Sequence, residues 1–384
     1  ARVIDVTEPL GPTDLGPTES DDVVAVSPGH RYWIGVPDEA RSPESVRPAT
    51  VLDLEALGGT TYLAIAPAPF HTTLESLLAH RRSEGHVAAV VDVRAVRDSL
   101  GTGVPDPEAV RHLVDQIPSL RYLLVVGDAT AQPGGYHPEV GSLRVETPFT
   151  RTATLGETPA DGLLGTDADG QLRVAVGRLP ATSSDELQAM IEKTIEWETN
   201  QNTLRALVVS DDEAEFAELA GRIVQALPTG AMAGRIDVAE EGSRADLLAA
   251  LRRGSVWLNY TGHGSLTVLC DDGLLRLDDS GSWRQPAVVV AWTCLAAHFV
   301  HPTQDSMAEV WLREPRGGVA AFLGPVGETT SGEQEPFLRA FYRAVGEGHR
   351  LGDAWLTALR EGGSEDVRWG YVLLGDPALR LVPE

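Results

Sequence analysis

Two residues that could perform acyl transfer, His263 and Cys294, each follow a short apolar run. His263 lies between two glycines in residues 259–265 (NYTGHGS), and Cys294 ends residues 285–294 (QPAVVVAWTC). A thiolate attacks a carbonyl once an imidazole has removed the thiol proton, and the imidazole can then protonate the leaving amine. Glycines beside the histidine let the chain turn and let a substrate come close. The amides of Gly264 and Cys294 are candidates for binding the oxyanion.

Each candidate also has a plainer interpretation. A cysteine at a strand end is commonly a small core residue, and a histidine in a glycine turn is commonly structural. The occurrence of both at strand ends within one unit favours catalysis. The other cysteine, Cys270, lies in the acidic segment LCDDG, where Asp271 and Asp272 would raise the pKa of a thiol, so we interpret it as structural. Two thiols alone exclude a disulfide framework and a structural zinc site.

The strands that would carry these residues belong to a chain of alternating strands and helices. Predicted strands are 61–67, 86–93, 121–129, 172–180, 205–212, 234–240, 255–265, 285–294 and 317–327, and the segment 370–381 ends the chain. Predicted helices are 70–84, 106–117, 183–198, 215–227, 243–254, 335–345 and 351–360. Continuous apolar strands that alternate with helices indicate parallel sheets covered on both faces. Reactive groups gather at the carboxyl ends of such strands, and parallel neighbours lie about 4.8 Å apart, so His263 and Cys294 can meet.

Length suggests two packed units. A chain of 384 residues predicts a first α/β subdomain over 59–202 and a second over 203–384, which carries the catalytic candidates. Residues 1–58 are interpreted as an N-terminal arm or the tail of a preceding domain, with 31–36 as an edge strand. Residues 1–20 are acidic and Pro-rich, unlike a signal peptide, although a leader could have been lost.

Charge limits the partners. The net charge of −25 argues against nucleic acid and anionic membranes, and fits an enzyme of basic substrates or simply an acidic surface. No apolar run approaches the roughly 20 residues that span a bilayer, so membrane insertion is not expected. Lys193 is the only lysine, and arginine supplies the remaining positive charge.

Several segments together resemble the gingipain-type cysteine peptidases of the caspase-like clan. They are NYTGHGS, PAVVVAWTCLAAHF, SMAEVWL, GGVAAFLG and YVLLGDPAL, joined by YLLVVGDA and VAVGRLP earlier in the chain. The resemblance covers about residues 60–381. It implies a caspase-like α/β fold with two side-by-side subdomains, each with a mostly parallel sheet flanked by helices. It also implies His263 as base, Cys294 as nucleophile, and secretion.

The resemblance further implies an acidic partner for the histidine, just after residues 205–212. Asp212 is our choice and Asp211 the reserve, although both could instead cap the following helix. Some relatives cut after Arg or Lys by means of an acid on that helix. Glu213, Glu215 and Glu218 lie in this region, but they also suit a solvated helix face.

The opposite wall of the substrate pocket would come from Thr330 and Ser331, where some relatives carry an aromatic residue. Calcium is a candidate structural ion, since some relatives bind it. Asp161, Asp167 and Asp169 are closely spaced, but EF-hand spacing is missing and TDADG also suits an Asp-Gly turn. No cofactor is expected to be required.

The sequence therefore predicts a cysteine endopeptidase that acts on protein or peptide substrates through a Cys-His dyad and an acyl-enzyme, with Arg or Lys favoured at P1. One alternative is a processing peptidase or transpeptidase of the same family, in which an amine replaces water. A second alternative is a non-catalytic binding module on the same fold, against which the presence of both His263 and Cys294 argues.

Overall fold

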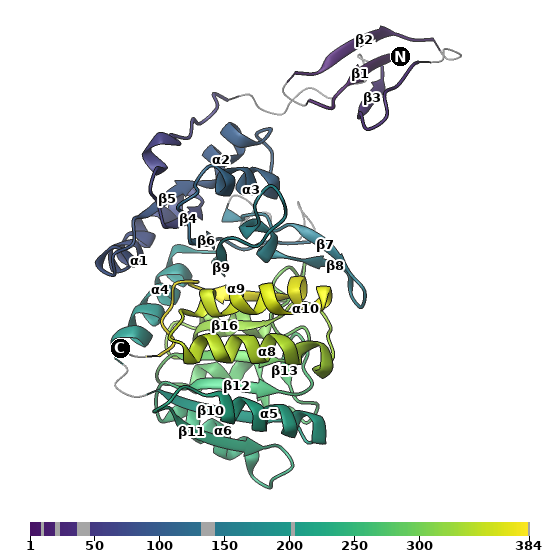
Figure 1. Ribbon diagram of the computed structural model, residues 1–384. Helices are drawn as coiled ribbons and strands as arrows, with labels where there is room; N and C mark the ends of the chain where they lie inside the picture. Colours follow the sequence, from purple (N-terminus) through teal and green to yellow (C-terminus); the bar gives the residue numbers. More distant parts are fainter. Residues whose placement is uncertain (9–10, 20–23, 37–46, 132–142, 201–203, 383–384) are drawn as a thin grey trace.

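The computed structural model describes residues 1–8, 11–19, 24–36, 47–131, 143–200 and 204–382, and one ten-stranded sheet runs through its body (Figure 1). Along the sheet the order is β11-β10-β12-β15-β16-β17-β9-β6-β4-β5. The second half of the sheet comprises β10 (Arg205–Ser210), β11 (Met232–Asp237), β12 (Trp257–Thr261), β15 (Ala287–Trp292), β16 (Val319–Pro325) and β17 (Tyr371–Gly375). The first half comprises β4 (Tyr62–Ala66), β5 (Ala88–Asp92), β6 (Tyr122–Val126) and β9 (Ala175–Leu179).

The last strand of the chain joins the two halves. β17 pairs antiparallel with β16 on one side and parallel with β9 on the other, where Leu374 stands opposite Arg178. The two predicted sheets are thus one continuous sheet, in which β17 and the strands of the first half run opposite to the other strands of the second half. The predicted boundary between residues 202 and 203 lies outside the described residues.

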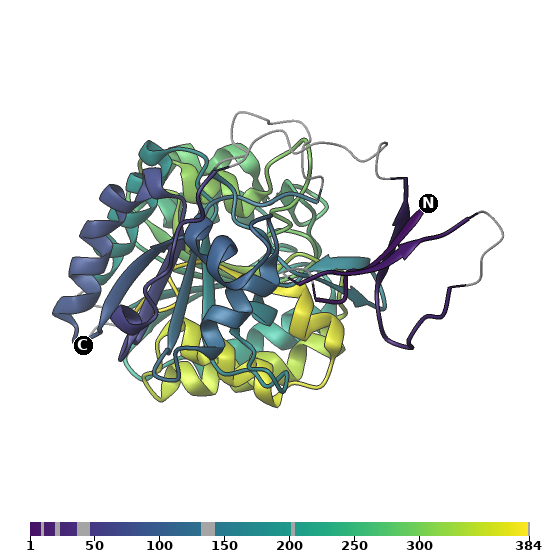
Figure 2. The same ribbon diagram turned by 90° about the horizontal axis from the view of Figure 1, so that it is seen from above.

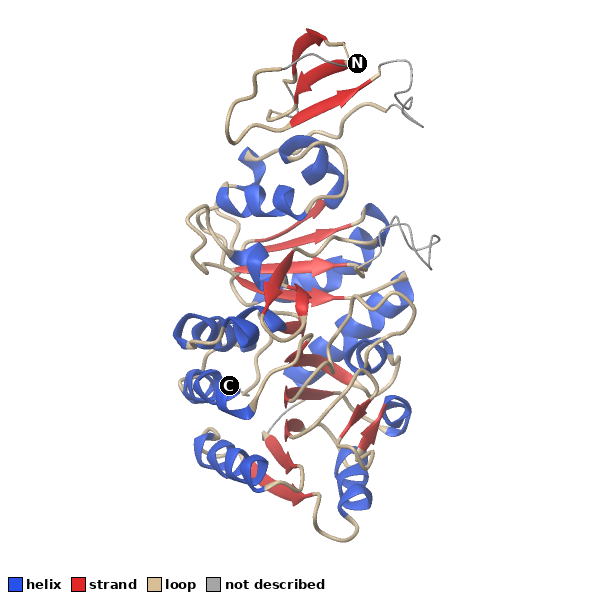
Figure 3. Ribbon diagram, turned by 90° about the vertical axis from the view of Figure 1, so that its right-hand side faces the viewer, coloured by secondary structure: helices blue, strands red, loops and turns tan. Residues whose placement is uncertain are grey.

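Helices cover both faces of the sheet (Figures 2 and 3). Their bounds are α1 (His71–Ser83), α2 (Val93–Leu100), α3 (Pro107–Asp115), α4 (Ser184–Thr199), α5 (Ala214–Ala226), α6 (Ser243–Arg252), α7 (Met307–Arg313), α8 (Ser331–Gly346), α9 (Leu351–Glu361) and α10 (Glu365–Gly370). Helices α1, α4, α6 and α7 share one core with the sheet, whereas α5, α8, α9 and α10 pack on the other face of its second half. Helices α2 and α3 cover that face of the first half. Burial from both sides explains why the strands are apolar throughout.

Two short hairpins and several 3-10 segments lie outside the main sheet and its helices. Two hairpins are formed by β7 (Phe149–Thr152) with β8 (Gly156–Pro159) and by β13 (Val268–Leu269) with β14 (Leu275–Arg276). Single 3-10 turns are η2 (Glu55–Leu57), η3 (Ala68–Phe70), η5 (Asp161–Gly165) and η6 (Leu277–Ser282). Within the described part of the chain, no helix is long and apolar enough to cross a bilayer.

The N-terminal residues form a small sheet that stands apart from the body (Figures 1 and 2). It is antiparallel, in the order β2 (Thr13–Pro17), β1 (Arg2–Asp5), β3 (Tyr32–Gly35). β3 lies at its edge, as residues 31–36 predicted. Ile34 is 63% exposed on this strand, and Val3 supplies the buried side chain of β1.

The closing LLGDP segment ties the two halves together. Asp376 is fully buried and accepts a hydrogen bond of 2.9 Å from Nε of Arg81, which also contacts Glu84 and Glu198. Gly177 on β9 has no room for a side chain, because a Cβ there would lie 2.3 Å from the carbonyl oxygen of Gly375. The motif is therefore structural, and it seats β17 against the first half.

The only lysine of the chain is buried between two helices. Lys193, on α4, donates to the backbone carbonyls of Trp311, Leu312 and Glu314, at the end of α7. Those carbonyls have no partner within their own helix, so the ammonium group satisfies them. Burial, as the largest cause, lowers the pKa of Lys193 to about 7.

Candidate active site

The turns that carry His263 and Cys294 are in direct contact. β12 and β15 are parallel neighbours, and Thr261 at the end of one stands opposite Trp292 at the end of the other. A Cβ on Gly264 would lie 2.3 Å from Oγ1 of Thr293 and 3.2 Å from the carbonyl oxygen of Cys294. The glycine after the histidine thus allows the two turns to touch.

The glycine before the histidine is required for a separate reason. A Cβ on Gly262 would lie 2.4 Å from the hydroxyl oxygen of Tyr260 and 2.5 Å from Cβ of Asp211. Both neighbours are nearly fully buried and cannot move aside without disturbing the core. The GHG pattern is therefore explained by two independent close approaches.

The imidazole of His263 is bonded to Glu213. Its Nε2 lies 3.0 Å from Oε1 of Glu213, and its ring meets that of Phe216 edge-on, with 5.2 Å between ring centroids. The two side chains are 52% and 47% exposed, so an ion pair between them would stabilise the fold by only about 0.2–1 kcal/mol. Glu213 precedes α5 as its N-cap residue but makes no side-chain cap, which leaves its carboxylate free for the histidine.

The predicted acidic partner, Asp212, is not the group bonded to the imidazole. Asp212 is exposed, and among the described residues its carboxylate makes no hydrogen bond to His263. The reserve candidate, Asp211, is 3% exposed and accepts from the backbone N–H of His263 at 3.0 Å instead of from the ring. Successive side chains at a strand end point in different directions, so a shift of one residue in the sequence changes which acid reaches the imidazole.

The thiol of Cys294 is half-buried. Its Sγ lies 3.5 Å from the carbonyl oxygen of Thr329, and the described residues show no hydrogen bond between this sulfur and His263. Burial, followed by the charge of Glu328, raises the pKa of Cys294 above its ordinary value. A pKa lowered by a neighbouring imidazolium, which a preformed ion pair would produce, is therefore not found in this geometry, because the imidazole faces Glu213.

The backbone around Cys294 has an unusual conformation and leaves two N–H groups without a backbone acceptor in the part of the chain that the structure describes. Leu295, directly after it, has a φ of 58°, in a region that side chains rarely adopt, and its N–H donates to the carbonyl of Gly327. Among the backbone hydrogen bonds of the described residues, none is donated by the amides of Gly264 and Cys294. Both predicted oxyanion donors are thus available to a ligand.

A buried glutamine supports the cysteine turn from behind. Nε2 of Gln334, on α8, donates to the carbonyl of Thr293 at 3.2 Å and to Oγ1 of Thr329 at 2.9 Å. The hydroxyl of Tyr371 approaches the same Thr293 carbonyl at 3.4 Å. Gln334 was not predicted from the sequence. A glutamine on the otherwise apolar face of α8 was the available signal.

Thr330, predicted to form a wall of the substrate pocket, is bonded within the end of a helix instead. Thr330 is the N-cap of α8, and it forms a capping box with Glu333, so its hydroxyl is bonded within the helix end. Ser331 begins α8. On the other side, Glu215 is exposed in the first turn of α5, and Glu218 lies 3.9 Å from Arg222. The exposed acids at and just before the start of α5 are among the remaining candidates for binding a basic side chain.

The described residues do not bring the three calcium candidates into one cluster. Asp161 is buried and makes a two-pronged ion pair with Arg178, with distances of 2.6 and 2.8 Å. Asp167 accepts from the N–H groups of Asp169 and Gln171 in a local turn. The acidic groupings in the described residues lie elsewhere. One is at His80, Glu84 and Glu198, beside the guanidinium of Arg81, and the other at Asp211, Asp212 and Glu213.

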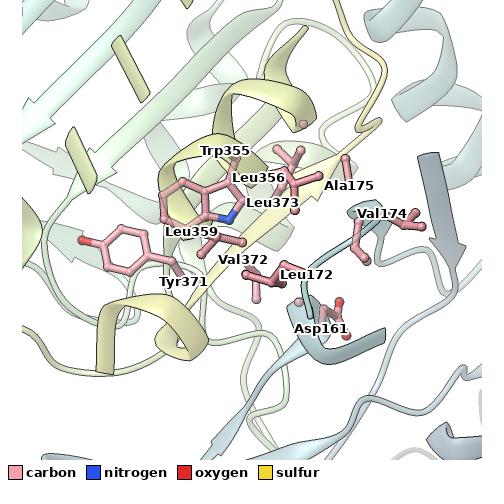
Figure 4. A pocket seen from close by; sticks show the side chains of 13 residues that line it. Asp161, Leu172, Val174, Ala175, Trp355, Leu356, Leu359, Tyr371, Val372 and Leu373 are labelled. Atoms are coloured by element: carbon pink, nitrogen blue, oxygen red, sulfur yellow. The ribbon is translucent and has the colours of Figure 1, made fainter. Parts of the chain in front are cut away.

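A small cavity lies between the halves of the sheet. Its volume is about 20 Å³, and Figure 4 shows Asp161, Trp355 and Tyr371 among its lining side chains. A larger polar cavity of about 280 Å³ lies beside the segment that follows Cys294, and Asp128, His301 and Glu309 are among its lining residues.

Comparisons with known proteins agree with this geometry. A family model described as peptidase family C25 matches residues 55–382. A solved structure described as the Arg-specific cysteine proteinase gingipain R is 16% identical, covers 84% of this chain and 78% of its own, and has a TM-score of 0.66. The complex of the pro- and mature domains of RgpB from Porphyromonas gingivalis is 17% identical, with coverage of 84% and 79% and a TM-score of 0.66.

A further structure, described only as a protease, is 15% identical and covers 84% of this chain and 78% of its own, with a TM-score of 0.67. Among curated proteins no sequence matches. At these identities the likeness concerns the fold, and it confirms the predicted caspase-like α/β architecture.

Proposed function

Because the chain belongs to peptidase family C25, and is therefore a cysteine peptidase, we propose that Cys294 is its nucleophile and His263 its general base. The observation that carries this assignment is the contact between the two strand-end turns, where Gly264 leaves no space beside Thr293 and Cys294. The only other cysteine, Cys270, is buried and donates its thiol hydrogen to a carboxylate, so it does not compete for the role.

In the proposed reaction, the sulfur of Cys294 attacks the substrate carbonyl carbon while His263 takes the thiol proton. Nε2 of His263 carries the hydrogen that is bonded to Glu213, which leaves Nδ1 to accept that proton. The amides of Gly264 and Cys294 donate to the oxyanion that forms. The C–N bond then breaks, and the amine leaves with the proton from the imidazolium. Water hydrolyses the thioester in the reverse sense and restores the thiol.

The raised pKa of Cys294 bears on the timing of proton transfer. A thiol that is protonated at neutral pH must lose its proton as it attacks, so His263 acts as a general base and not as half of a standing ion pair. Glu213 keeps the imidazole oriented and offsets its positive charge after the transfer. Water is excluded when a substrate covers the exposed pair, and this strengthens the interaction.

We further propose a preference for Arg or Lys at P1. The support is the set of exposed carboxylates near His263, namely Asp212, Glu213 and Glu215, together with Glu328 beside Cys294 and the net charge of −25. A basic side chain would be attracted to this region over a distance limited by salt screening. The structural likeness to an Arg-specific proteinase is in line with this preference.

A peptide library varied at P1 tests the proposal, with Cys294→Ala and His263→Ala as controls. We expect cleavage after Arg or Lys, a kcat/KM that falls as salt is raised, and no turnover in either variant. Activity retained by Cys294→Ala would refute its role as nucleophile. A profile dominated by acidic P1 residues would overturn the basic preference alone. Peptide products joined to an added amine would point to transpeptidation.

A further inference from the structure

A buried carboxylate lies beneath the turn that carries His263. Asp211 follows the last residue of β10, and its side chain points inward, with 3% exposure. Its Oδ2 accepts from the backbone N–H of His263 at 3.0 Å and lies 3.2 Å from the hydroxyl of Tyr260. Its Oδ1 accepts from the N–H of Asp212 at 3.0 Å and from the thiol of Cys270 at 3.2 Å. Oδ1 therefore has two donors, and Oδ2 has the N–H of His263 as its donor.

The carbonyl group of His263 is held by the same residues. The backbone N–H of Cys270 donates to it at 2.9 Å, and the hydroxyl of Tyr260 lies 2.7 Å away. Tyr260 and Cys270 also contact Asp211, which receives the N–H of His263. The peptide groups on both sides of the histidine are thus held by the side chains of Asp211 and Tyr260 and by the backbone N–H of Cys270.

The backbone conformation of Cys270 indicates that its thiol makes a contribution that glycine could not make. Its φ is 64°, in the left-handed region, which costs free energy for a residue with a Cβ. Glycine would adopt this turn without that cost. The cysteine gains one thing that glycine lacks, a thiol that reaches Asp211. The turn alone does not account for a cysteine at this position.

From these contacts we propose that Asp211 and Cys270 are positioning residues, which hold His263 at the correct place for proton transfer with Cys294. The thiol of Cys270 acts as a hydrogen-bond donor and not as a reactive group. Neither residue touches the reacting atoms, which distinguishes them from Glu213, bonded to the imidazole itself. The inference rests on the proposed role of His263 as general base.

The protonation of Cys270 suits a permanent donor. Burial, followed by the hydrogen bond to Asp211, raises the pKa of this thiol to about 12. The hydrogen is therefore present throughout the pH range in which the fold is expected to work. A thiolate at this place would face the carboxylate of Asp211 with no hydrogen between them, which is strongly unfavourable in a buried site.

Four variants of two residues test the inference: Asp211→Asn, Cys270→Ser, Cys270→Ala and Cys270→Gly. Because a displacement of about 1 Å can cost up to about 100-fold in rate, we expect kcat to fall by about tenfold or more in Asp211→Asn and Cys270→Ala. KM should stay within about twofold, since neither group is expected to contact substrate. Cys270→Ser, which keeps a donor, should retain a higher kcat than Cys270→Ala.

Cys270→Gly distinguishes the effect of the thiol donor from the effect of the left-handed backbone conformation. It relieves the left-handed conformation but removes the thiol, so we expect a melting temperature near that of the wild type and a kcat as low as that of Cys270→Ala. A wild-type kcat in both Cys270→Gly and Cys270→Ala would overturn the role of the thiol. A wild-type kcat in Asp211→Asn would overturn the role of the carboxylate.

The pH dependence of Cys294 alkylation by iodoacetamide gives a readout without substrate, which a merely structural role would not move. We expect the variants to shift this profile toward that of His263→Ala, and profiles identical to the wild type would count against positioning. If His263→Ala lowers kcat but the four variants do not, positioning fails while the proposed catalysis stands. If His263→Ala has full activity, the proposed base fails and the positioning role fails with it.

Asp376→Asn is the matched control. It replaces another fully buried carboxylate, bonded to Arg81 and remote in the fold from the histidine turn. We expect this change to lower the melting temperature without altering kcat for correctly folded enzyme. A fall in kcat equal to that of Asp211→Asn would show that the loss reflects general destabilisation, and it would overturn the inference.

Discussion

Gly264→Ala is the change that tests most directly whether the two catalytic turns must touch. The new Cβ would lie 2.3 Å from Oγ1 of Thr293, about 1 Å closer than ordinary van der Waals contact. The amide of residue 264 is retained, so the variant keeps its donor to the oxyanion. The histidine turn must move away from Cys294 by about 1 Å, a displacement that can cost about 100-fold in rate.

Steady-state kinetics and thermal unfolding measure the two effects of Gly264→Ala separately. We expect kcat to fall by about 100-fold, since the near-attack geometry is lost. Overpacking of a buried contact of this kind destabilises by about 1–3 kcal/mol, so the folded state should survive. Iodoacetamide should still reach Cys294, which would show that the nucleophile remains accessible.

A second substitution distinguishes steric displacement from other effects. Oγ1 of Thr293 is buried with no hydrogen-bond partner among the described residues, so Thr293→Ala alone should be tolerated. In the double variant the nearest remaining atom is the carbonyl oxygen of Cys294, at 3.2 Å from the new Cβ, and much of the activity should return. Thr293→Val keeps the bulk and should not rescue. A Gly264→Ala enzyme with wild-type kcat, or equal rescue by both threonine variants, would refute the reasoning.

Three further expectations concern other parts of the fold. Glu213→Gln should lower kcat by up to about fivefold, because an exposed pair contributes up to about 1 kcal/mol. Asp212→Asn should leave kcat unchanged. If steady-state assays show the larger loss in Asp212→Asn, Asp212 is the partner of His263 after all. The pKa of Lys193 is about 7 in the folded protein and 10.5 in the unfolded chain, so between these pH values the unfolded chain binds one more proton. This group therefore makes the unfolding free energy rise with pH across that window. Lys193→Met should flatten the rise in denaturant titrations, and an unchanged slope would contradict the lowered pKa of Lys193. Thr330→Ala should cost about 1 kcal/mol of stability through loss of the helix cap, and a changed P1 profile would return Thr330 to the substrate pocket.

The sequence was sufficient for the parts of the site that follow from strand patterns. Continuous apolar runs predicted parallel strands buried on both faces, and the rule that reactive groups lie at carboxyl ends brought His263 and Cys294 to adjacent turns. The direction of β17 was not predictable in this way, because an apolar run has the same pattern in a parallel and an antiparallel strand. The fusion of two sheets into one depends on that strand.

Other features depend on contacts that no local pattern encodes. Which of three consecutive acids meets the imidazole is decided by where β10 ends, and the answer, Glu213, lies one residue beyond our choice. The ion pair of Asp161 with Arg178, which removes a calcium candidate, joins residues on separate elements. The capping box of Thr330 was legible in the sequence, as a threonine followed three residues later by Glu333.

The burial of Lys193 has a consequence for the fate of an acyl-enzyme. A thioester can be captured by a primary amine as well as by water, and surface lysines are the usual amines that protein molecules offer one another. In this chain the only lysine is 3% exposed and occupied by the carbonyls at the end of α7, and guanidinium groups are too basic to act as nucleophiles near neutral pH. The thioester proposed on Cys294 would therefore meet no exposed lysine among these 384 residues on a second copy of the chain. Isopeptide cross-links through a lysine of this chain are accordingly not expected.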